Sequence, residues 1–436
     1  MKKILTTLVL SLTFISFLHA SNFDPLLASR LQNLTDSLRL ANNIKGISVC
    51  VLHPQQGRWQ GVSGISHQGT PIDSNMLFGI GSNTKLFTGV LMLKLMQSGL
   101  IQLDDSLHQW LPAYTNINPN ISIRQLLNHR SGLADINSIP GYPDSILSNP
   151  YRIFTPQEVL TWVGTPLFPP GNAYSYCNTN YILAGLIAEI ASGQSYVQLL
   201  HDSILNPLQL DSTFLGAYDS ISYPLAQPWQ GSTNNFPVSR NAVNSVSWAS
   251  GGMVSTASEM AQWYQALMNG EVLQQNAFAE MTTFTGSAAY GIGLYQTVIN
   301  NRVVWQHGGS IWGGYNSSMM YDTSSGIIVA VMVNQNPGQA FSIASQLLME
   351  TTNFLVGSPE LSNNKKTVML FPNPANNKLC VYTNENLQTI NIFNFRGEKL
   401  MESNSKQIDV SNLSCGMYFL QIVTVHGVQT CSFIRQ

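Results

Sequence analysis

A serine and a lysine three positions apart, Ser82 and Lys85, have the residue types and the spacing that nucleophilic catalysis needs. Residues i and i+3 share one face of a helix, so the two side chains can meet at a helix N-terminus, where the dipole favours developing negative charge. The apolar run at residues 86–96 would bury the lysine, and burial favours the neutral amine that can accept a serine proton. Most isolated pairs of this kind are solvated helix starts capped by the serine, so the prediction depends on the rest of the chain.

Two later segments supply groups that could complete such a site. Tyr176 and Asn178 come directly before another apolar helix, where a phenol beside a lysine can carry protons and an amide can orient a substrate. His307-Gly308-Gly309 lies between a strand expected at residues 303–306 and a turn expected at residues 310–314. Glycine beside a strand lets another backbone or a substrate approach closely, so this segment could flank a bound substrate.

The elements that must position these residues alternate between helical and strand patterns, which indicates an α/β fold. Strands are expected near both ends of the segment, with helices between them, so distant parts of the chain must build one sheet around a helical insertion. The expected strands are residues 47–53, 58–65, 291–298, 303–306, 317–321 and 327–334. The expected helices are residues 25–41, 82–96, 156–163, 180–191, 195–205, 257–268 and 340–354.

Taken together, the three motifs resemble those of penicillin-binding DD-peptidases and class C β-lactamases, together with their esterase relatives. The resemblance extends over residues 24–350 and includes the segments at residues 122–133, 176–193 and 250–263. It implies an antiparallel sheet flanked by helices, with a helical insertion. It also implies acyl transfer to a serine followed by hydrolysis, on an ester, amide or D-amino-acid peptide substrate, without a metal or an organic cofactor.

The resemblance also implies a role for each motif residue. Ser82 would be the acylated nucleophile and Lys85 its base. Tyr176 would pass a proton to the leaving group and later help to activate the deacylating water. Asn178 would contact both the substrate amide and Lys85.

The segment His307-Gly308-Gly309, called the histidine segment below, would supply the other side of the substrate site. His307 stands where many relatives have a lysine, and it would flank the substrate from the sheet edge together with Gly309. The backbone N–H groups of Ser82 and Ser310 would form the oxyanion hole, in which each preorganised donor contributes about 3 kcal/mol to transition-state stability.

Three positions depart from the pattern of the family. Gly308 stands where many carboxylate-recognising relatives have a Thr or Ser hydroxyl, which weakens the case for a β-lactam or a free D-alanyl carboxylate as substrate. Cys177 replaces the usual Ser between Tyr and Asn, where no proton is carried. Arg130 replaces a common small hydroxyl residue, with no effect that the sequence predicts. One alternative function stays open, a catalytically silent penicillin-binding or sensor-type protein of the same fold.

The two ends of the chain indicate export. Residues 1–20 combine Lys2 and Lys3 with a short apolar run and a small residue, Ala20, which predicts a signal peptide; an uncleaved membrane anchor is the alternative. No later segment reaches 18 uninterrupted apolar residues, so no transmembrane span is expected in the mature chain. The hydrolase domain would then occupy residues 21–356, and a polar linker residues 357–366.

Residues 367–436 change to short alternating runs separated by glycine turns, which predicts a small all-β sandwich. This segment resembles the C-terminal sorting domain of type IX secretion substrates, on Phe371-Pro372-Asn373-Pro374-Ala375, residues 392–398, residues 408–422 and Phe433-Ile434. The resemblance implies contact with secretion machinery and a secreted or cell-surface protein that is exported through the periplasm. A sandwich that merely stabilises the protein or binds carbohydrate is the alternative.

Composition excludes other classes of function. The chain has 20 basic and 22 acidic residues and no basic cluster beyond its N-terminus, so a nucleic-acid partner is not expected. Its 8 histidines and 5 cysteines have no metal-ligand spacing. The odd number of cysteines leaves at least one thiol unpaired in a monomer, and one bridge among the three C-terminal cysteines stays open.

Overall fold

The computed structural model describes residues 23–139, 146, 148–236, 238–356, 368–383, 386–394, 397–425 and 427–436. The expected signal peptide and the expected linker therefore lie outside the described residues. Residues up to Leu355 form one compact unit, and residues from Val356 form another. In the part of the chain that is described, no helix combines the length and the apolar character needed to cross a bilayer.

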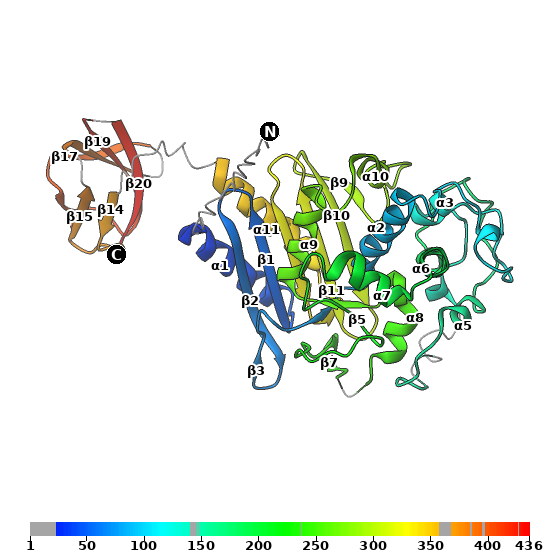
Figure 1. Ribbon diagram of the computed structural model, residues 1–436. Coiled ribbons are helices and arrows are strands. Elements are labelled where there is room, and N and C mark those ends of the chain that lie inside the picture. Colours follow the sequence, from blue (N-terminus) through cyan, green and yellow to red (C-terminus); the bar gives the residue numbers. More distant parts are fainter. Residues whose placement is uncertain are drawn as a thin grey trace, which may run out of the picture. The chain divides into compact units, whose positions relative to one another are not determined.

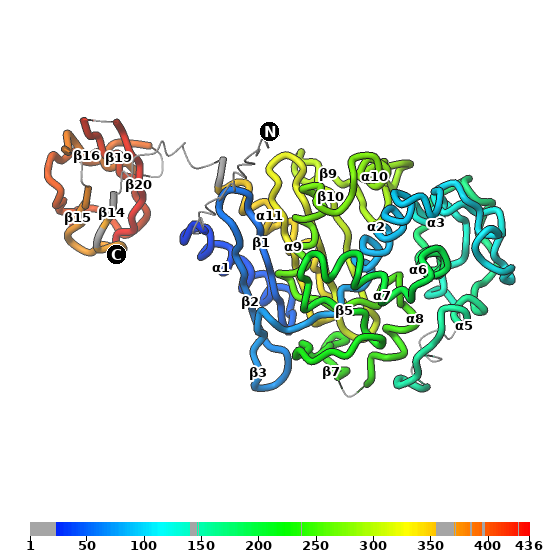
Figure 2. Tube along the Cα trace, in the orientation of Figure 1, coloured from blue at the N-terminus to red at the C-terminus, as the bar shows by residue number. Residues whose placement is uncertain are grey.

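The N-terminal unit is built on a seven-stranded sheet with the order β3-β2-β1-β12-β11-β10-β9. Its strands are β1 (Gly46–His53), β2 (Gly57–His67), β3 (Thr70–Pro71), β9 (Tyr295–Ile299), β10 (Arg302–Ile311), β11 (Tyr315–Asp322) and β12 (Ile328–Val333). All neighbours are antiparallel, and β1 pairs with β12 in the register Ile47 to Val333. Figures 1 and 2 show these blue and yellow strands side by side, which confirms that both ends of the unit contribute to one sheet.

Helices cover both faces of this sheet (Figure 1). Side chains alternate between the two faces of a strand, so Val49 and Cys50 in β1 belong to different cores. The Val49 face packs against α1 (Pro25–Ala41) and α11 (Ala340–Val356). The Cys50 face packs against the larger core that includes α9 (Ala257–Met268).

The region between the two groups of strands is mainly helical, as the sequence predicts. Its other helices are α2 (Thr84–Gln97), α3 (Ile123–Leu127), α5 (Pro156–Leu160), α6 (Asn178–Ser192), α7 (Tyr196–Leu200), α8 (Asn241–Gly251) and α10 (Gln275–Met281). Short strands form two further three-stranded sheets, with the orders β13-β6-β7 and β4-β8-β5. They are β4 (Phe78–Gly79), β5 (Phe214–Leu215), β6 (Trp229–Gln230), β7 (Thr233–Asn234), β8 (Met253–Ser255) and, after β12, β13 (Gln335–Asn336). The helix α2 is mostly apolar, has no distinct polar face and is largely buried, with α6 and α8 packed against it, which is the usual place for such a helix.

Several sequence-based expectations about local structure are wrong. The strand expected at residues 291–298 begins only at Tyr295, in β9. The turn expected at residues 310–314 begins later, because pairing with β11 extends β10 through Ile311. The helix α8 is not predicted, because its sequence is rich in Ser and Asn, which have weak helix propensity. Its backbone is broken at Trp248, where φ is 33° and ψ is −120°.

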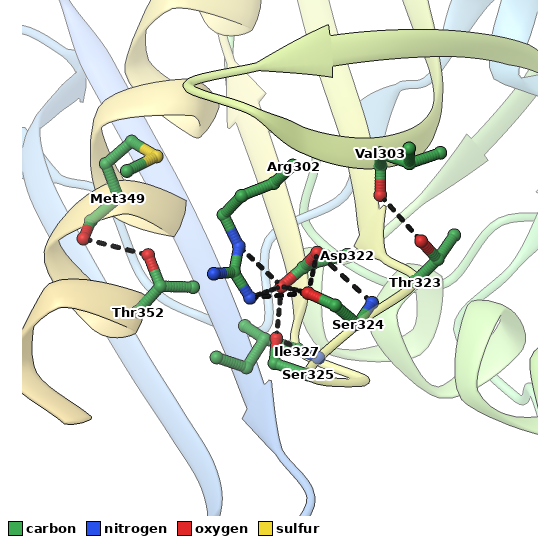
Figure 3. Close-up of polar contacts among 9 residues, drawn as sticks. All are labelled: Arg302, Val303, Asp322, Thr323, Ser324, Ser325, Ile327, Met349 and Thr352. Carbon is green, nitrogen blue, oxygen red and sulfur yellow. Dashed lines mark hydrogen bonds and ion pairs between the residues drawn. The ribbon is translucent and has the colours of Figure 1, made fainter. Parts of the chain in front are cut away.

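A buried ion pair joins two turns at one end of the sheet. Asp322, at the end of β11, has a fully buried side chain and accepts a hydrogen bond from Arg302 Nε at 2.9 Å. Ser324 and Ser325 also donate to this carboxylate (Figure 3). Burial alone would raise the pKa of Asp322, but these hydrogen bonds hold it below its usual value. The pair fixes the start of β10, the strand that carries the histidine segment.

The C-terminal unit is a small all-β sandwich with its own core, as expected. One sheet has the order β14-β15-β18 and the other β17-β16-β19-β20. The strands are β14 (Val368–Phe371), β15 (Lys378–Thr383), β16 (Leu387–Phe393), β17 (Lys399–Ser403), β18 (Gln407–Asp409), β19 (Gly416–Thr424) and β20 (Gly427–Arg435). Leu379, Ile390 and Leu420, from both sheets, share one hydrophobic core. Cys380, Cys415 and Cys431 are all free thiols.

Candidate active site

Ser82 lies in a 3-10 turn, Gly81–Asn83, that precedes α2, and not in the α-helix where the sequence places it. Lys85 lies in the first turn of α2. The three-residue spacing still brings the pair together, because side chains three apart also align on a 3-10 turn. Lys85 Nζ is 3.2 Å from Ser82 Oγ, and Ser82 is partly exposed whereas Lys85 is completely buried.

Two carbonyl oxygens hold the Lys85 amine. Its Nζ donates to Asn178 Oδ1 at 2.6 Å and to the backbone carbonyl of Ser250 at 2.8 Å. A neutral amine has two N–H donors and one lone pair. In the neutral form both donors are used on the two carbonyls, which leaves the lone pair available to the hydroxyl of Ser82.

The surroundings of Lys85 favour that neutral form. Burial lowers its pKa to about 7, and this effect exceeds the opposing influence of Asp135 and Cys177. A base with a pKa near neutrality can accept a proton and release it again at ordinary pH. The arrangement is therefore chemically able to activate Ser82.

Tyr176 lies against the same lysine. Lys85 Nζ is 4.8 Å from the centre of the Tyr176 ring. The Tyr176 hydroxyl is buried and has no hydrogen-bond partner of normal geometry. Burial raises its pKa well above the usual value, and a weaker contact with Ser82 opposes part of that rise. The phenol therefore keeps its proton and can donate it to a group that enters the site.

His129 supports the segment that carries Tyr176. Its Nδ1 accepts the Cys177 N–H at 3.1 Å, and its ring centre is 4.3 Å from that of Tyr176. Burial lowers the pKa of His129 well below its usual value, so the ring is neutral. This histidine positions a loop, and the thiol of Cys177 is inert because burial raises its pKa to about 12.

His307 is buried on β10 beside the site. Its Nδ1 donates to the Gly308 carbonyl at 2.7 Å, and its Nε2 is 3.2 Å from the hydroxyl of Tyr290. Because a carbonyl only accepts, the proton is on Nδ1 and Nε2 is the acceptor. Burial, with a smaller effect of Lys85, lowers the pKa of His307 to about 3. His307 therefore brings no positive charge to this side of the site.

The strand β10 lies directly against the turn that carries the serine. A β-carbon on Gly309 would be 1.9 Å from the Ile80 carbonyl oxygen, so only glycine fits there. Ser317 Oγ donates to the same carbonyl at 2.7 Å and accepts from Asn83 Nδ2 at 2.9 Å. This network fixes the distance between the Ser82 turn and β10.

The same contact brings together the two segments that would form the oxyanion hole. A β-carbon on Gly81, where φ is +54°, would be 2.9 Å from Ser310 N. Gly81 directly precedes Ser82, so the backbone N–H groups of Ser82 and Ser310 come from neighbouring segments.

Two cavities meet at Ser82. The narrower one, of about 230 Å³, lies on the side of α8 and the β10–β11 turn. The wider one, of about 620 Å³, is lined by Tyr176 and His307, which do not line the narrower cavity. No Lys, Arg, Asp or Glu among the described residues lines either cavity.

Each residue predicted from sequence is therefore in or beside this site, and two further groups come from elsewhere. Asp135 accepts from the Asn178 amide, and the Ser250 carbonyl accepts from Lys85. Ser250 belongs to the segment at residues 250–263 that carries part of the family resemblance, but nothing local marks its carbonyl as a partner of Lys85. Asp135 lies in a loop whose residue types indicate only a turn.

The family of the N-terminal unit follows from comparison with known sequences. The beta-lactamase family model matches residues 22–352, which is most of the chain. The chain belongs to the beta-lactamase family. A second model, described as a secretion system C-terminal sorting domain, matches residues 369–436, so this beta-lactamase-family chain has a sorting domain that indicates secretion or cell-surface export.

Its relatives include penicillin-binding proteins and peptidases. The chain is 27% identical over 279 residues to penicillin-binding protein 4* of Bacillus subtilis strain 168, with 57% of this chain and 59% of that protein covered. It is 26% identical over 305 residues to a D-aminopeptidase of Gluconobacter oxydans, with 69% of this chain and 57% of that protein covered. The chain thus spans little more than half the length of these relatives.

Solved structures agree with the family. A D-amino acid amidase from Ochrobactrum anthropi has a TM-score of 0.68 and 25% identity, with 76% of this chain and 99% of that chain covered. An octameric penicillin-binding protein homologue from Pyrococcus abyssi, with a TM-score of 0.64 and 19% identity over 93% of this chain and 90% of that chain, shows the fold alone. The predicted fold and family are confirmed.

Proposed function

We propose that the N-terminal unit is a serine hydrolase that forms an acyl-enzyme on Ser82. The observation that carries the proposal is the contact between Ser82 Oγ and Lys85 Nζ at 3.2 Å, made by a buried lysine whose pKa is lowered to about 7. The names of a D-aminopeptidase and a D-amino acid amidase among its relatives support amide bonds as substrates, beside esters.

The proposed reaction begins when the neutral Lys85 amine removes the Ser82 proton. Oγ then attacks the substrate carbonyl, and the developing oxyanion is stabilised by the N–H groups of Ser82 and Ser310. Tyr176 donates a proton to the leaving group, because its raised pKa keeps the phenol protonated. Lys85 then returns the Ser82 proton to Tyr176. Water attacks the acyl-enzyme as one of its protons passes through Tyr176 to Lys85, and Lys85 gives that proton to Ser82 Oγ when the bond between Oγ and the acyl carbon breaks.

The two cavities separate the two parts of the substrate. Because Tyr176 lines only the wider cavity, the leaving group belongs there and the acyl group in the narrower one. The wider, leaving-group cavity is lined by Asn178, His307 and Gly309, and Asn178 also lines the narrower cavity. His307 is neutral, position 308 has no hydroxyl, and no Lys or Arg among the described residues lines this cavity, so no positive charge favours a carboxylate there. We therefore propose uncharged esters and amides, including D-amino-acid peptides, ahead of β-lactams.

Active-site labelling tests this proposal against a silent, sensor-type protein. Fluorophosphonate should label the wild type and not Ser82→Ala. The wild type should also hydrolyse a p-nitrophenyl ester with repeated turnover, and nitrocefin slowly or not at all. Equal labelling of Ser82→Ala would overturn the nucleophile, and a single turnover without further hydrolysis would favour the sensor. Rapid nitrocefin hydrolysis would overturn the proposed substrate class.

We also propose how the whole chain is organised. Residues 1–20 are a cleaved signal peptide, residues 21–356 the hydrolase, residues 357–366 a linker and residues 367–436 the domain that engages the secretion machinery after passage through the periplasm. Deletion of residues 367–436 should leave an active hydrolase inside the cell envelope. Unchanged secretion of that deletion variant would contradict the sorting role, and Met1 on the secreted protein would contradict cleavage.

A further inference from the structure

The carboxylate of Asp135 ends a chain of contacts that begins at the proposed nucleophile. Asn178 Nδ2 donates to Asp135 Oδ2 at 2.9 Å and to Oδ1 at 3.2 Å. The other end of the same amide, Oδ1, accepts from Lys85 at 2.6 Å. We propose that Asp135 is a positioning residue of the reaction, which orients the Asn178 amide and thereby holds the Lys85 amine toward Ser82. This inference rests on the proposed function.

The orientation of the Asn178 amide depends on both of its neighbours. A carboxylate only accepts hydrogen bonds, so it selects the NH2 end of the amide. The carbonyl end must then face Lys85, where it accepts one of the two N–H donors of the neutral amine. If the amide were reversed, its NH2 group would face the lysine, and the lone pair directed at Ser82 would be lost. Asp135 therefore acts on Lys85 through Asn178, without touching the substrate.

The loop that carries Asp135 is fixed to the start of α6. Thr179, the residue after Asn178, accepts the Ile136 N–H at 3.2 Å and donates to the Ala134 carbonyl at 2.8 Å. These bonds lie on both sides of Asp135 in the sequence. They hold its carboxylate at the Asn178 amide, because the backbone before and after it is anchored to the next residue of α6.

Asp135 also acts on the lysine through its charge. Burial is the main cause of the lowered pKa of Lys85, and Asp135 is the first influence that opposes it. Removal of this negative charge should lower that pKa further. The other titratable groups that face or act on the Lys85 amine are Tyr176, Tyr181, Cys177, His129 and His307. None of these carries a formal charge near neutral pH, because burial raises the pKa values of the phenols and the thiol and lowers those of the histidines.

Two substitutions separate the effect of Asp135 on the orientation of the Asn178 amide from the effect of its negative charge on Lys85. Asp135→Asn removes the charge but keeps an oxygen that can accept from Asn178 and from the Asn137 N–H that Asp135 caps at 3.0 Å. The acid limb of the kcat/KM profile for p-nitrophenyl ester hydrolysis should move to lower pH by about half a unit or more. Asp135→Ala removes the acceptor as well, and kcat/KM should fall on the order of 100-fold.

Asp24→Asn is the matched control. Asp24 caps α1 by accepting the Leu26 N–H at 2.8 Å, so it is also a capping aspartate, but it has no contact with Asn178. Both Asn variants keep an oxygen that can cap, so if capping were the only role of Asp135, the two variants should have similar thermal stability and an unchanged pH profile. Only the Asp135→Asn variant should move the pH profile.

The outcomes distinguish this inference from the proposed function. If the wild type hydrolyses esters and Ser82→Ala does not, an unmoved profile in Asp135→Asn together with normal activity in Asp135→Ala overturns the role of Asp135 and leaves the hydrolase intact. If the wild type itself has no turnover, crystal structures of the wild type and Asp135→Ala decide. The Asn178 side chain should move out of hydrogen-bond distance of Lys85 Nζ in the variant, and an unchanged contact would overturn the inference.

Discussion

Lys85 Nζ is 2.6 Å from Asn178 Oδ1 and 3.2 Å from Ser82 Oγ, so the amide holds the lysine more closely than the nucleophile does. Together with the Ser250 carbonyl, Asn178 fixes the amine from two helices, α6 and α8. The longer contact to Ser82 is the one that must shorten during proton transfer. A base that is already oriented needs little reorganisation at that step.

The pH dependence of hydrolysis should follow the titration of Lys85. Protonated lysine cannot accept the Ser82 proton, so kcat/KM should be low in acid and rise with a midpoint near the lysine pKa of about 7. No alkaline decrease should follow up to about pH 10, because the pKa of Tyr176 is well above its usual value. Steady-state kinetics on a p-nitrophenyl ester from about pH 5 to about pH 10 measure this profile. A midpoint near the usual pKa of a carboxylate would contradict a lysine base.

Tyr176→Phe should separate catalysis from stability. The hydroxyl has no hydrogen-bond partner of normal geometry among the described residues, so its removal should change the free energy of unfolding by less than about 0.5 kcal/mol. Loss of the proton donor should lower kcat by about 10² to 10⁴. Tyr264→Phe is the control, because its hydroxyl is also buried without a partner but lies in α9. Chemical denaturation and ester kinetics on both variants check the prediction, and equal activity of the two would contradict the role of Tyr176.

Adjacent glycines on β10 should respond differently to alanine. Gly309→Ala places a β-carbon 1.9 Å from the Ile80 carbonyl oxygen, so the Ser82 turn and β10 must separate. We expect a loss of ester hydrolysis on the order of 100-fold, since the nucleophile and the Ser310 N–H no longer keep their distance. In Gly308→Ala the nearest atom to the new β-carbon is 3.5 Å away, an ordinary contact, so the protein should keep its fold and most of its activity. Similar kinetics for both variants would show that the close approach of the two segments is not required.

Arg302→Leu should destabilise the N-terminal unit, although Arg302 lines neither of the two cavities at Ser82. It leaves the Asp322 carboxylate buried without its cation, which costs about 3 kcal/mol in unfolding free energy. Arg152→Leu removes a more exposed pair with Glu158 and should have little effect. Urea denaturation of both variants measures the difference. Equal stability of the two variants would show that Ser324 and Ser325 suffice to hold the carboxylate.

The contribution of the Asp322 carboxylate to the unfolding free energy should depend on pH. Because folding lowers the pKa of Asp322, this stabilisation is present above the carboxylate pKa of the unfolded chain and is lost as pH falls through the pKa of the folded protein.

Much of the fold could be predicted from local pattern. The helices α1 and α9 have the predicted bounds, because each has an apolar stripe at helical spacing and begins directly after a capping residue, Asp24 or Thr256. The strands β1 and β12 were predicted to within two residues, but their pairing joins segments about 280 residues apart. The helix α8 was missed, because its Ser and Asn residues have weak helix propensity and only packing against α6 and α2 stabilises it.

The sequence by itself determined the family and the two-part organisation, and it predicted Ser82, Lys85 and Tyr176 as candidate catalytic residues, because short motifs encode residue types and spacing. Tertiary structure decided which groups hold the lysine. Asp135 lies 43 residues before Asn178, and the Ser250 carbonyl is presented to Lys85 across a separation of 165 residues, just after the backbone break at Trp248. Backbone carbonyls have no residue signature, and contacts at such separations arise only when α2, α6 and α8 pack together. The protonation state of Lys85 follows from that packing, since burial is what lowers its pKa.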